Sequence, residues 1–510
     1  MQANTQKFDV IVIGSGLGGL VSALIMAKEG IKVCVLEKNN QFGGNLQTFS
    51  RNKKIFDTGV HYLPSLAEGQ ILNQYFSYLD IQNALKLKRM PLVFDVVEFE
   101  SDSNSYPHAQ EKKHFVKELG QYFPEEIKAL EKYVLDLEKT CRNFPLYHLS
   151  KENKNQDDLM HLTVEEYFDG LTKNEKLKAV LIGSNFLYAG KGNQTPFYVH
   201  ALAINAYLQS AYKCVLGGSQ LTKALIRELK KHEAVVLKQQ EVEKYVVEID
   251  QLTSIETKDG QRYTADMFIS NIDPKQLLKN IGAQHFRKSY YTRVQEMPVT
   301  VSSFSVHAIL KPGSIEYIPH NVFHHQDEKS VWNATDYSAS QWPPMYMLSM
   351  TEDPKNLGFA ESLTLLTYMK FEEVEEWAGT KNTVLAKHNR SNDYQQFKQQ
   401  KIDACIHKLA SRIPNLKENI EATYASTPLS YRDYIGVHRG NIYGHVKDAQ
   451  NPLLSFISPK TKIKNLYLTG QGVNMHGILG VTIGAVATCS EILGKDYLID
   501  KIKSEITNKS

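Results

Sequence analysis

Cysteine is scarce in this sequence of 510 residues. Its five cysteines are scattered along the chain: Cys34, Cys141, Cys214, Cys405 and Cys489. An odd number of cysteines without a C-x-x-C pair argues against a disulfide framework and provides no zinc-binding pattern. We therefore expect a protein of a reducing compartment.

The sequence also lacks an excess of charge of either sign. Its formal net charge of +3 does not indicate a dedicated nucleic-acid binder. The short basic run KLKR, from Lys86 to Arg89, fits a solvated face better than a surface that follows phosphates. Nucleic acid is therefore not among the expected partners. The length exceeds what one simple core holds, so we expect two domains.

Neither a secretory leader nor a membrane span is expected. The opening MQANTQKFDV leads directly into an apolar strand, which leaves no room for a signal peptide. Residues 465–490 contain no Asp, Glu, Lys or Arg, but Gln471, Asn474, His476 and several glycines interrupt them. We interpret this stretch as a buried strand, a glycine turn and a helix. The expected location is the cytoplasm, with peripheral membrane contact at most.

The opening segment FDVIVIGSGLGGLVSALIMAKEGIKVCVLEKNN predicts a strand–helix–strand unit. Residues 10–13 form a β-branched run typical of a strand buried on both faces. Glycines in G-x-G-x-x-G spacing follow at once, then a helix over 20–28 and a second strand over 32–36. This order is the fingerprint of a dinucleotide site.

Each residue of the fingerprint has a physical role. Gly14 permits the tight turn, Gly16 lets the backbone approach a pyrophosphate, and Gly19 lets helix and strand pack closely. Glu37, about 20 residues further on, is placed to hold a ribose hydroxyl. The alternative is a glycine turn without a ligand, but the complete strand–helix–strand–acid context favours dinucleotide binding.

The same order of elements recurs near the end of the chain. There NLYLTGQGVNMHGILGVTIGAVATCSEIL predicts a strand, a glycine turn and a helix. ADMFISN also suits a strand that rejoins the first sheet. These features predict an α/β protein with a discontinuous Rossmann-type dinucleotide domain and an inserted α+β substrate domain. The first comprises residues 1–70, 215–285 and 425–510, and the second comprises 71–214 and 286–424.

Six motifs together carry a resemblance to a known family: GSGLGG, Glu37, Gly43-Gly44, FDTGVHY, GGSQLTKAL and LYLTGQGV with GILG. This combination resembles the phytoene desaturase and retinol saturase branch of the FAD-dependent amine-oxidase-like superfamily. FDTGVHY (56–62) and TPLSYRDYIGVHRGNIYG (427–444) look most like the retinol saturase and carotenoid isomerase group. The resemblance spans nearly the whole chain and is strongest in the first 65 and last 90 residues.

The resemblance implies FAD as the cofactor and implies which residues hold it. These are Gly14, Gly16, Leu17, Gly18 and Gly19 at the pyrophosphate; Glu37, Lys38 and Val242 at the adenosine; Gly43, Gly44, Asn45, Gly470 and Gln471 along the ribityl chain; and Gly480, Val481 and Ile483 at the flavin ring. The chain departs from the family in two places. Asn45, Leu46 and Gln47 replace two cysteines and a histidine of some members, and Gly472 replaces an acid.

The implied activity is oxidoreduction at carbon–carbon double bonds of an apolar polyene or isoprenoid lipid, most like retinol saturation. Desaturation and cis–trans isomerisation of a carotenoid are alternatives within the enzyme class. A prenyl-lipid-binding escort on the same fold lies outside the enzyme class, and an amine oxidase is a further alternative within it. The sequence holds one convincing dinucleotide fingerprint, so we expect an external electron donor or acceptor rather than a bound nicotinamide.

His61 and Tyr62 are the candidate catalytic residues. They follow a motif expected to run beside the flavin. Saturation of an alkene requires a proton donor, and either side chain can hold a proton at neutral pH. His476, before the closing helix, is a second candidate. The alternative interpretation is that these side chains only shape the pocket.

A metal site is not expected. His320, His324 and His325 in PHNVFHHQD suggest one by composition, but no acidic or cysteine partner recurs at a suitable spacing. We expect this segment to be a surface loop.

Overall fold

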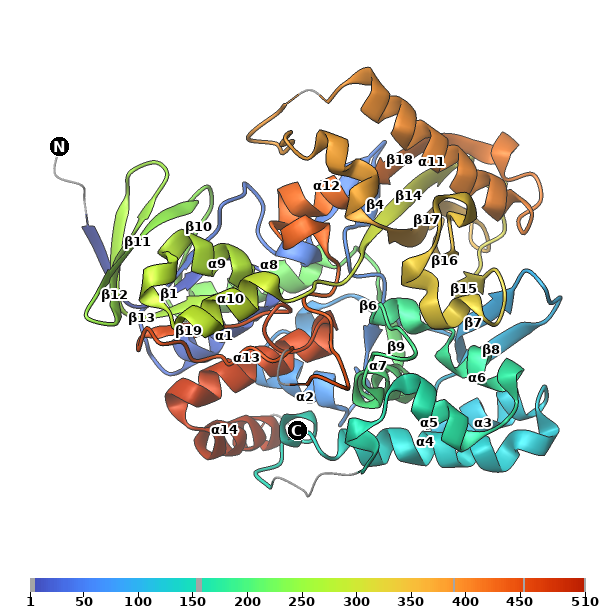
Figure 1. The fold of residues 1–510 in the computed structure, drawn as a ribbon, viewed down its shortest axis with the longest axis horizontal. Helices are drawn as coiled ribbons and strands as arrows, with labels where there is room; N and C mark the ends of the chain where they lie inside the picture. Colours follow the sequence, from blue (N-terminus) through green and yellow to red (C-terminus); the bar gives the residue numbers. More distant parts are fainter. Residues whose placement is uncertain (1–4, 153–157, 389, 453–454, 509–510) are drawn as a thin grey trace.

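The structure is a computed structural model that describes residues 5–152, 158–388, 390–452 and 455–508. The chain folds into two lobes, each built around a seven-stranded sheet (Figure 1). The amino-terminal strand and the carboxy-terminal helices lie in the same lobe, so the two ends of the sequence contribute to one body.

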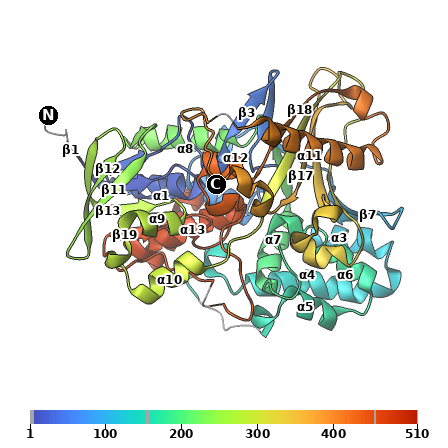
Figure 2. The ribbon, with the colours of Figure 1, turned by 45° about the horizontal axis from the view of Figure 1, so that its top comes forward.

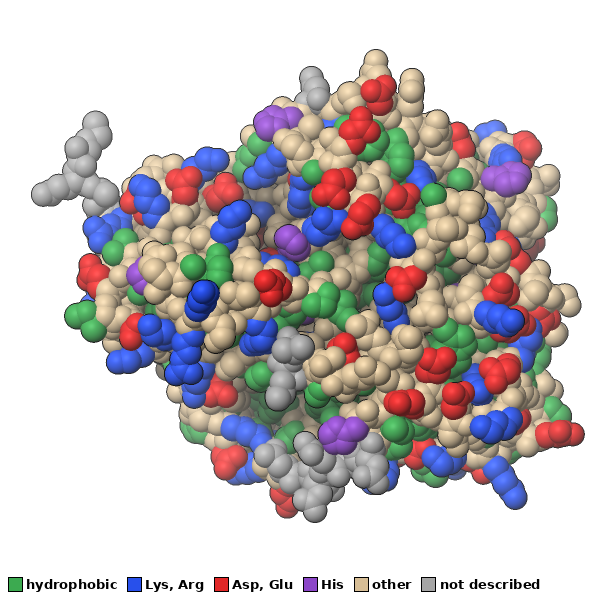
Figure 3. All heavy atoms as spheres, in the orientation of Figure 1, with side chains coloured by type: hydrophobic (Ala, Val, Ile, Leu, Met, Phe, Trp, Pro, Cys, Tyr) green, Lys and Arg blue, Asp and Glu red, His purple; other side chains and the backbone are tan. Residues whose placement is uncertain are grey.

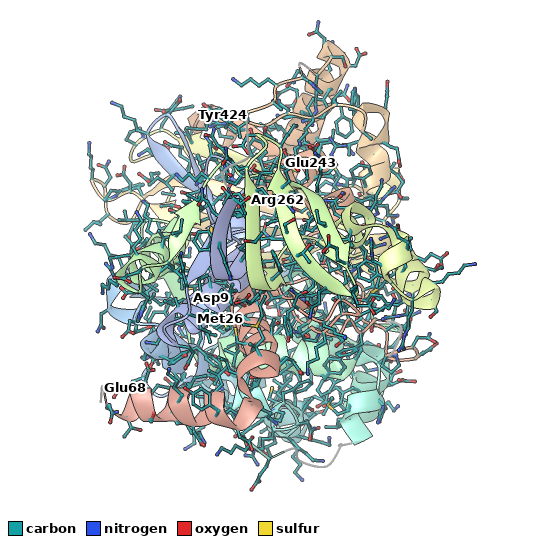
Figure 4. All side chains as sticks on the ribbon, turned by 90° about the vertical axis from the view of Figure 1, so that its left-hand side faces the viewer. Asp9, Met26, Glu68, Glu243, Arg262 and Tyr424 are labelled. Atoms are coloured by element: carbon teal, nitrogen blue, oxygen red, sulfur yellow. The ribbon has the colours of Figure 1, made fainter. Side chains whose placement is uncertain are left out.

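The sheet of the first lobe collects strands from three distant parts of the sequence. Its order is β10 (Val235–Leu237), β2 (Val33–Leu36), β1 (Thr5–Ile13), β13 (Arg262–Ser270), β12 (Gln251–Thr257) and β11 (Val242–Glu248), with β19 (Leu466–Leu468) beside β13. The β10, β2, β1, β13 and β19 strands are parallel. This confirms the expected strand in ADMFISN, which is β13. Figure 4 shows this sheet, with Glu243 on β11 and Arg262 on β13.

Three helices cover one face of this sheet. The α1 helix (Leu17–Lys28) contacts both α8 (Ser219–Lys231) and α13 (Gly477–Leu493). Because α1 lies between the sheet and these helices, nearly all its side chains are buried, which explains its apolar sequence. On the other face lie α9 (Pro274–Ile281) and α10 (Lys288–Glu296).

The charge-free stretch 465–490 forms β19, a glycine turn and most of α13, as predicted. Among the residues that the structure describes, no helix combines the length and apolar character that crossing a membrane requires. The closing helix α14 (Lys495–Thr507) packs against α13 and α2 (Ile71–Tyr78).

The second lobe is built on a mixed sheet. Its order is β18 (Ile420–Ser426), β14 (Ser302–Leu310), β17 (Ala360–Met369), β16 (Met345–Glu352), β15 (Asn321–His325), β7 (Val93–Phe99) and β8 (Ser105–Ala109). The β15 and β7 strands pair in parallel, and the other pairs are antiparallel. The α11 helix (Asn392–Ala410) packs on one face (Figure 2).

A helical layer covers the other face of the second sheet. It consists of α3 (Lys112–Gly120), α4 (Ile127–Cys141), α5 (Val164–Leu171), α6 (Glu175–Ile182) and α7 (Phe197–Gln209). The remaining short elements are β3 (Thr48–Arg51) with β4 (Lys54–Asp57), the sheet of β5 (Leu63–Pro64), β9 (Ala211–Cys214) and β6 (Leu87–Arg89), and α12 (Pro428–Ser430).

The histidine segment PHNVFHHQD is not a surface loop, so that expectation is wrong. His324 and His325 lie on β15, between β16 and β7. His325 is fully buried and hydrogen bonds the Gly183 carbonyl at 2.7 Å, while His324 stacks on Tyr346 at 4.6 Å between ring centroids. The polar composition of this segment is typical of a loop. The segment nevertheless forms a strand in the middle of the second sheet, where both of its faces are covered.

Candidate active site

A cavity of about 860 Å³ lies between the two lobes, at the carboxyl ends of β1, β2 and β13. In an open parallel sheet this edge is where ligands bind. Hydrophobic side chains are visible between the lobes in Figure 3, with lysines and arginines around them.

The turn between β1 and α1 is as tight as the fingerprint requires. Gly14 has φ of +93°, a left-handed conformation that favours glycine. A Cβ atom on Gly19 would lie 2.1 Å from the Gly14 carbonyl oxygen, so any side chain there would force the helix away from the strand. Gly19 therefore packs inside the turn and does not line the cavity, whereas Gly14, Gly16, Leu17 and Gly18 do.

Asn271, directly after β13, closes the other side of this turn. A Cβ on Gly16 would lie 2.7 Å from Asn271 Nδ2, and one on Gly18 would lie 2.7 Å from Asn271 Oδ1. The Asn271 backbone N–H donates to the Ile13 carbonyl at 2.8 Å. The sequence analysis missed Asn271, although a polar residue that ends an apolar strand was the available signal.

Glu37 lies directly after β2 and is buried. Its Oε2 accepts hydrogen bonds from the Ser15 N–H at 3.1 Å and the Ser15 hydroxyl at 2.6 Å, and its Oε1 accepts from the Asn39 N–H at 2.8 Å. The Gly43 N–H donates to the same Ser15 hydroxyl at 3.1 Å. The acid is thus fixed against the glycine turn, at the wall of the cavity.

The paired glycines bring a second segment of backbone onto the turn. Gly43 and Gly44 have φ of +113° and +55°, and Gly43 forms a parallel β-bridge with Gly16. Asn45 Nδ2 lies 3.4 Å from Gln471 Oε1, which links this segment to the carboxy-terminal turn. The backbones of Gly16, Gly43 and Gly44 therefore lie side by side and line the cavity without a side chain.

Several cationic side chains line the cavity. Lys38 is one of them, and burial followed by the nearby Lys381 lowers its pKa. Lys275, Lys381 and Arg432 also line the cavity, Arg432 paired with Asp433, as does Val242 at the start of β11. Positive charge beside a glycine turn suits the phosphates of a dinucleotide. The sequence analysis missed Lys381 and Arg432, because only the fold brings these residues of other segments here.

The closing helix α13 meets the cavity through its first turns. Gly477, Ile478 and Val481 line the cavity, while Gly480 and Ile483 do not. A Cβ on Gly480 would lie 2.8 Å from the Cβ of Met475, so this glycine serves helix packing. Of the three residues expected at the flavin ring, only Val481 lies at the wall.

Among the cavity-wall residues of the turn before α13, two buried polar atoms have no hydrogen-bond partner within the described protein. They are Thr469 Oγ1 and Gln471 Nε2, in the turn before α13. An unpartnered buried polar group is costly, so such atoms indicate where a polar ligand completes the site. Together with the side-chain-free wall of glycines, they fit the diphosphate and ribityl part of a flavin dinucleotide.

The inner end of the cavity is apolar and aromatic. Its wall includes Phe186, Tyr207, Met347, Leu366, Ile442 and Tyr443. These residues come from both lobes, so the cavity joins a polar cradle to a hydrophobic chamber. Such a chamber suits a ligand with a long apolar body.

His61 lines the cavity, and its Nε2 is buried without a partner in the described protein. Burial, with a smaller effect from Lys213, lowers the pKa of His61 to about 4, so the imidazole is neutral at pH 7. His476 also has its pKa lowered to about 4 by burial, and its Nε2 lies 3.2 Å from the Leu187 carbonyl oxygen. His476 does not line the cavity.

Tyr62 lines the cavity and donates a hydrogen bond from its hydroxyl to Asp95 Oδ2 at 2.8 Å. Asp95 is buried on β7, and its Oδ1 accepts from Asn321 Nδ2 at 2.8 Å. The sequence analysis missed this acid. An aspartate within the apolar strand VFDVVEF was a signal that could have found it.

Comparison with known proteins gives three kinds of similarity. Residues 12–79 match the NAD(P)-binding Rossmann-like domain family. The chain is 26% identical to all-trans-retinol 13,14-reductase of Danio rerio, over 97% of this chain and 87% of that protein. It is 22% identical to a chloroplastic prolycopene isomerase of an Oncidium hybrid, over 97% of this chain and 85% of that protein. An oxidoreductase structure from Methanosarcina mazei superposes with a TM-score of 0.64 at 15% identity, covering 95% of this chain and 100% of that one.

Proposed function

We propose that this chain, a relative of the retinol saturases and carotenoid isomerases, is an FAD-dependent oxidoreductase that reduces a carbon–carbon double bond of a polyene or isoprenoid lipid. The observation that carries the proposal is the single cavity that joins the glycine cradle to the aromatic chamber. A redox cofactor in the cradle and an apolar substrate in the chamber would meet within it.

FAD is the cofactor that the residues fit. The backbone at Gly16, Gly18 and Gly470 would hold the pyrophosphate, and Glu37 the adenosine ribose. When bound, FAD supplies hydride transfer, which none of the protein's side chains can perform.

The chain's own groups would bind and orient the substrate. The aromatic and aliphatic wall would enclose a polyene and exclude water from the reacting bond. Saturation also requires a proton on the second alkene carbon, and Tyr62 and His61 are the proton-bearing side chains named for this role in the inner wall.

Two partners belong to the proposal. An external electron donor would reduce the flavin, since the sequence offers one dinucleotide fingerprint. A membrane surface would supply the substrate, because polyenes and isoprenoids partition into lipid. The contact would be peripheral.

Desaturation and isomerisation remain the alternatives within the enzyme class. Saturation consumes two electrons, desaturation releases two, and isomerisation consumes none. A lipid escort is the alternative outside it, but an escort has no use for a polar cradle beside the lipid chamber.

The test is anaerobic turnover of chemically reduced protein with a conjugated polyene alcohol, followed by mass spectrometry of the lipid. We expect yellow protein with FAD and a product heavier by two hydrogens. A shift in double-bond geometry without a mass change would indicate an isomerase. Colourless protein that co-purifies with lipid would indicate an escort.

A further inference from the structure

A buried acid that does not itself line the cavity accepts a hydrogen bond from Tyr62, which does. Asp95 is 1% exposed and sits in the middle of β7, between β15 and β8. Its two oxygens accept one hydrogen bond each, from the Tyr62 hydroxyl and from the Asn321 amide. No arginine or lysine forms a salt bridge with this carboxylate in the described part of the chain.

Burial has the largest effect on the titration of Asp95. Burial raises its pKa to about 7, opposed by the two hydrogen bonds and by the nearby Lys213. Lys213, on β9, donates instead to the Met350 carbonyl at 3.0 Å, and burial lowers its pKa to about 8. The neighbouring titratable groups include His108, opposite Asp95 on β8, and Tyr443 near Tyr62. Tyr207 of α7 packs at a tilt against Tyr62 with ring centroids 4.3 Å apart.

The protonation state of Asp95 decides where the Tyr62 proton points. An ionised Asp95 can only accept hydrogen bonds, so the Tyr62 hydroxyl proton points at its carboxylate. Burial and this negative charge raise the pKa of Tyr62. A protonated Asp95 instead donates to the Tyr62 oxygen, which frees the hydroxyl proton for the cavity and makes it more acidic.

We propose that Tyr62 delivers the proton to the substrate and that Asp95 is the positioning residue that resupplies it. This inference rests on the proposed function. The alkene π bond is replaced by two C–H bonds, one formed with hydride from the reduced cofactor and one with the Tyr62 proton. The Asp95 proton then moves to the Tyr62 oxygen. After the product leaves, water in the cavity donates a proton to the Tyr62 oxygen as the Tyr62 proton passes back to Asp95. The electrons come from the external reductant of the flavin.

His61 is a weaker donor than Tyr62 in this arrangement. Its imidazole is neutral at pH 7, and loss of its remaining N–H proton would leave an anion with no partner behind it. Tyr62 has an acid within hydrogen-bond distance that neutralises the phenolate as it forms.

The test compares Asp95→Asn and Tyr62→Phe with a matched control, Asp57→Asn. Burial also raises the pKa of Asp57 to about 7, but this acid accepts from the Gly218 N–H at 2.6 Å and does not line the cavity. The measurements are the pH dependence of polyene reduction by pre-reduced enzyme and an infrared titration of the carboxylic acid band, which needs no turnover. FAD content and circular dichroism establish that each variant is folded.

We expect the wild-type rate to fall as the pH rises through about 7, tenfold for each further unit. Asp95→Asn should give a lower rate without this dependence and should remove an infrared band that titrates near pH 7. Tyr62→Phe should slow reduction by about 10²- to 10⁴-fold, the contribution typical of a positioned acid. Asp57→Asn should keep the wild-type pH profile.

A wild-type pH profile in Asp95→Asn, or no titrating band assignable to Asp95, would overturn the relay while the proposed function stands. A wild type that reduces no polyene would overturn the proposed function, and the relay with it.

Discussion

Gly18 and Gly470 face each other so closely that a Cβ atom on Gly18 would lie 3.0 Å from the Cα of Gly470. One glycine belongs to the first turn of the chain and the other to the turn before its closing helix. Contact between the two backbones forms the narrow floor of the cofactor cradle. No side chain larger than hydrogen fits at Gly18, and Gly470 itself requires its left-handed φ of +99°.

The first prediction concerns Gly16. A valine at this position would direct its side chain at the Asn271 amide, whose Nδ2 is 2.7 Å from the Cβ position, and into the space of the pyrophosphate. Gly16→Val should therefore purify without bound flavin, measured by absorbance and by FAD released on denaturation. Gly170→Ala is the control, since nothing lies within 4 Å of its Cβ position, and it should keep normal FAD content. Yellow Gly16→Val protein would show that the cradle is misplaced.

The second prediction concerns the charge of Glu37. Its carboxylate accepts three hydrogen bonds from Ser15 and Asn39. Glu37→Gln replaces one accepting oxygen by a donor that faces other donors, and hydrogen bonds to charged groups contribute about 1.5–3 kcal/mol. FAD affinity should fall by about 10- to 100-fold in titrations of apoprotein followed by fluorescence. An unchanged dissociation constant for FAD would mean that Glu37 stabilises the glycine turn but does not bind the cofactor.

The elements near the amino-terminus were predictable because their signals are local. The apolar run 10–13, the glycine spacing and Glu37 lie within one strand–helix–strand unit and appear in the structure as expected. Lys381 was not predictable as a site residue, because only the packing of distant segments brings it to the cavity. Asn271 and Asp95 carried a usable signal, a polar residue at the end of or within an apolar strand, but their places beside the glycine turn and beside Tyr62 depend on the fold. At α13 the helix was predicted correctly and Val481 lies at the cavity wall, but Gly480 packs against Met475 and does not line the cavity.

The third prediction concerns His61. The sequence favoured it as a proton donor alongside Tyr62, but burial holds its imidazole neutral at pH 7. We expect His61→Ala to keep its FAD and to slow polyene reduction far less than the 10²- to 10⁴-fold typical of a lost acid. Single-turnover kinetics of the reduced enzyme measure this. A loss within that range would make His61 the donor.

The fourth prediction concerns stability in acid. Burial lowers the pKa of His108, His200, His307 and His325 to between about 3 and about 4, against about 6.5 in an unfolded chain. Between these values the unfolded chain binds more protons than the folded one, so stability should fall as the pH drops from about 6.5 to about 4. The raised pKa values of Asp57 and Asp95 act in the opposite direction, but the four histidines outnumber them.

This fourth prediction is measured by thermal unfolding across that pH range. His200 is buried, hydrogen bonds Tyr133 at 2.7 Å and Tyr188 at 2.8 Å, and does not line the cavity. His200→Gln should lower the melting temperature at pH 7.5 but make its decline in acid shallower. An equal or steeper decline would contradict the assignment.

The fifth prediction concerns membranes. A lipid substrate favours association with a bilayer surface, and none of the helices in the described ranges is long and apolar enough to cross one. Alkaline carbonate, high salt or mild detergent should release the protein from a membrane fraction, followed by immunoblotting. Resistance to carbonate would require an anchor of another kind.

The pairing of β19 with β13 has a consequence for biosynthesis. β19 contributes Leu466–Leu468 to the first sheet beside residues 268–270, and the turn that follows it completes the cradle. A ribosome delivers the chain from its amino-terminus, so β1, α1 and β2 emerge long before their last neighbours. The glycine cradle is therefore incomplete until almost the whole chain has been made. Under the proposed function, FAD would bind only after β19 and the turn that follows it have joined the first sheet.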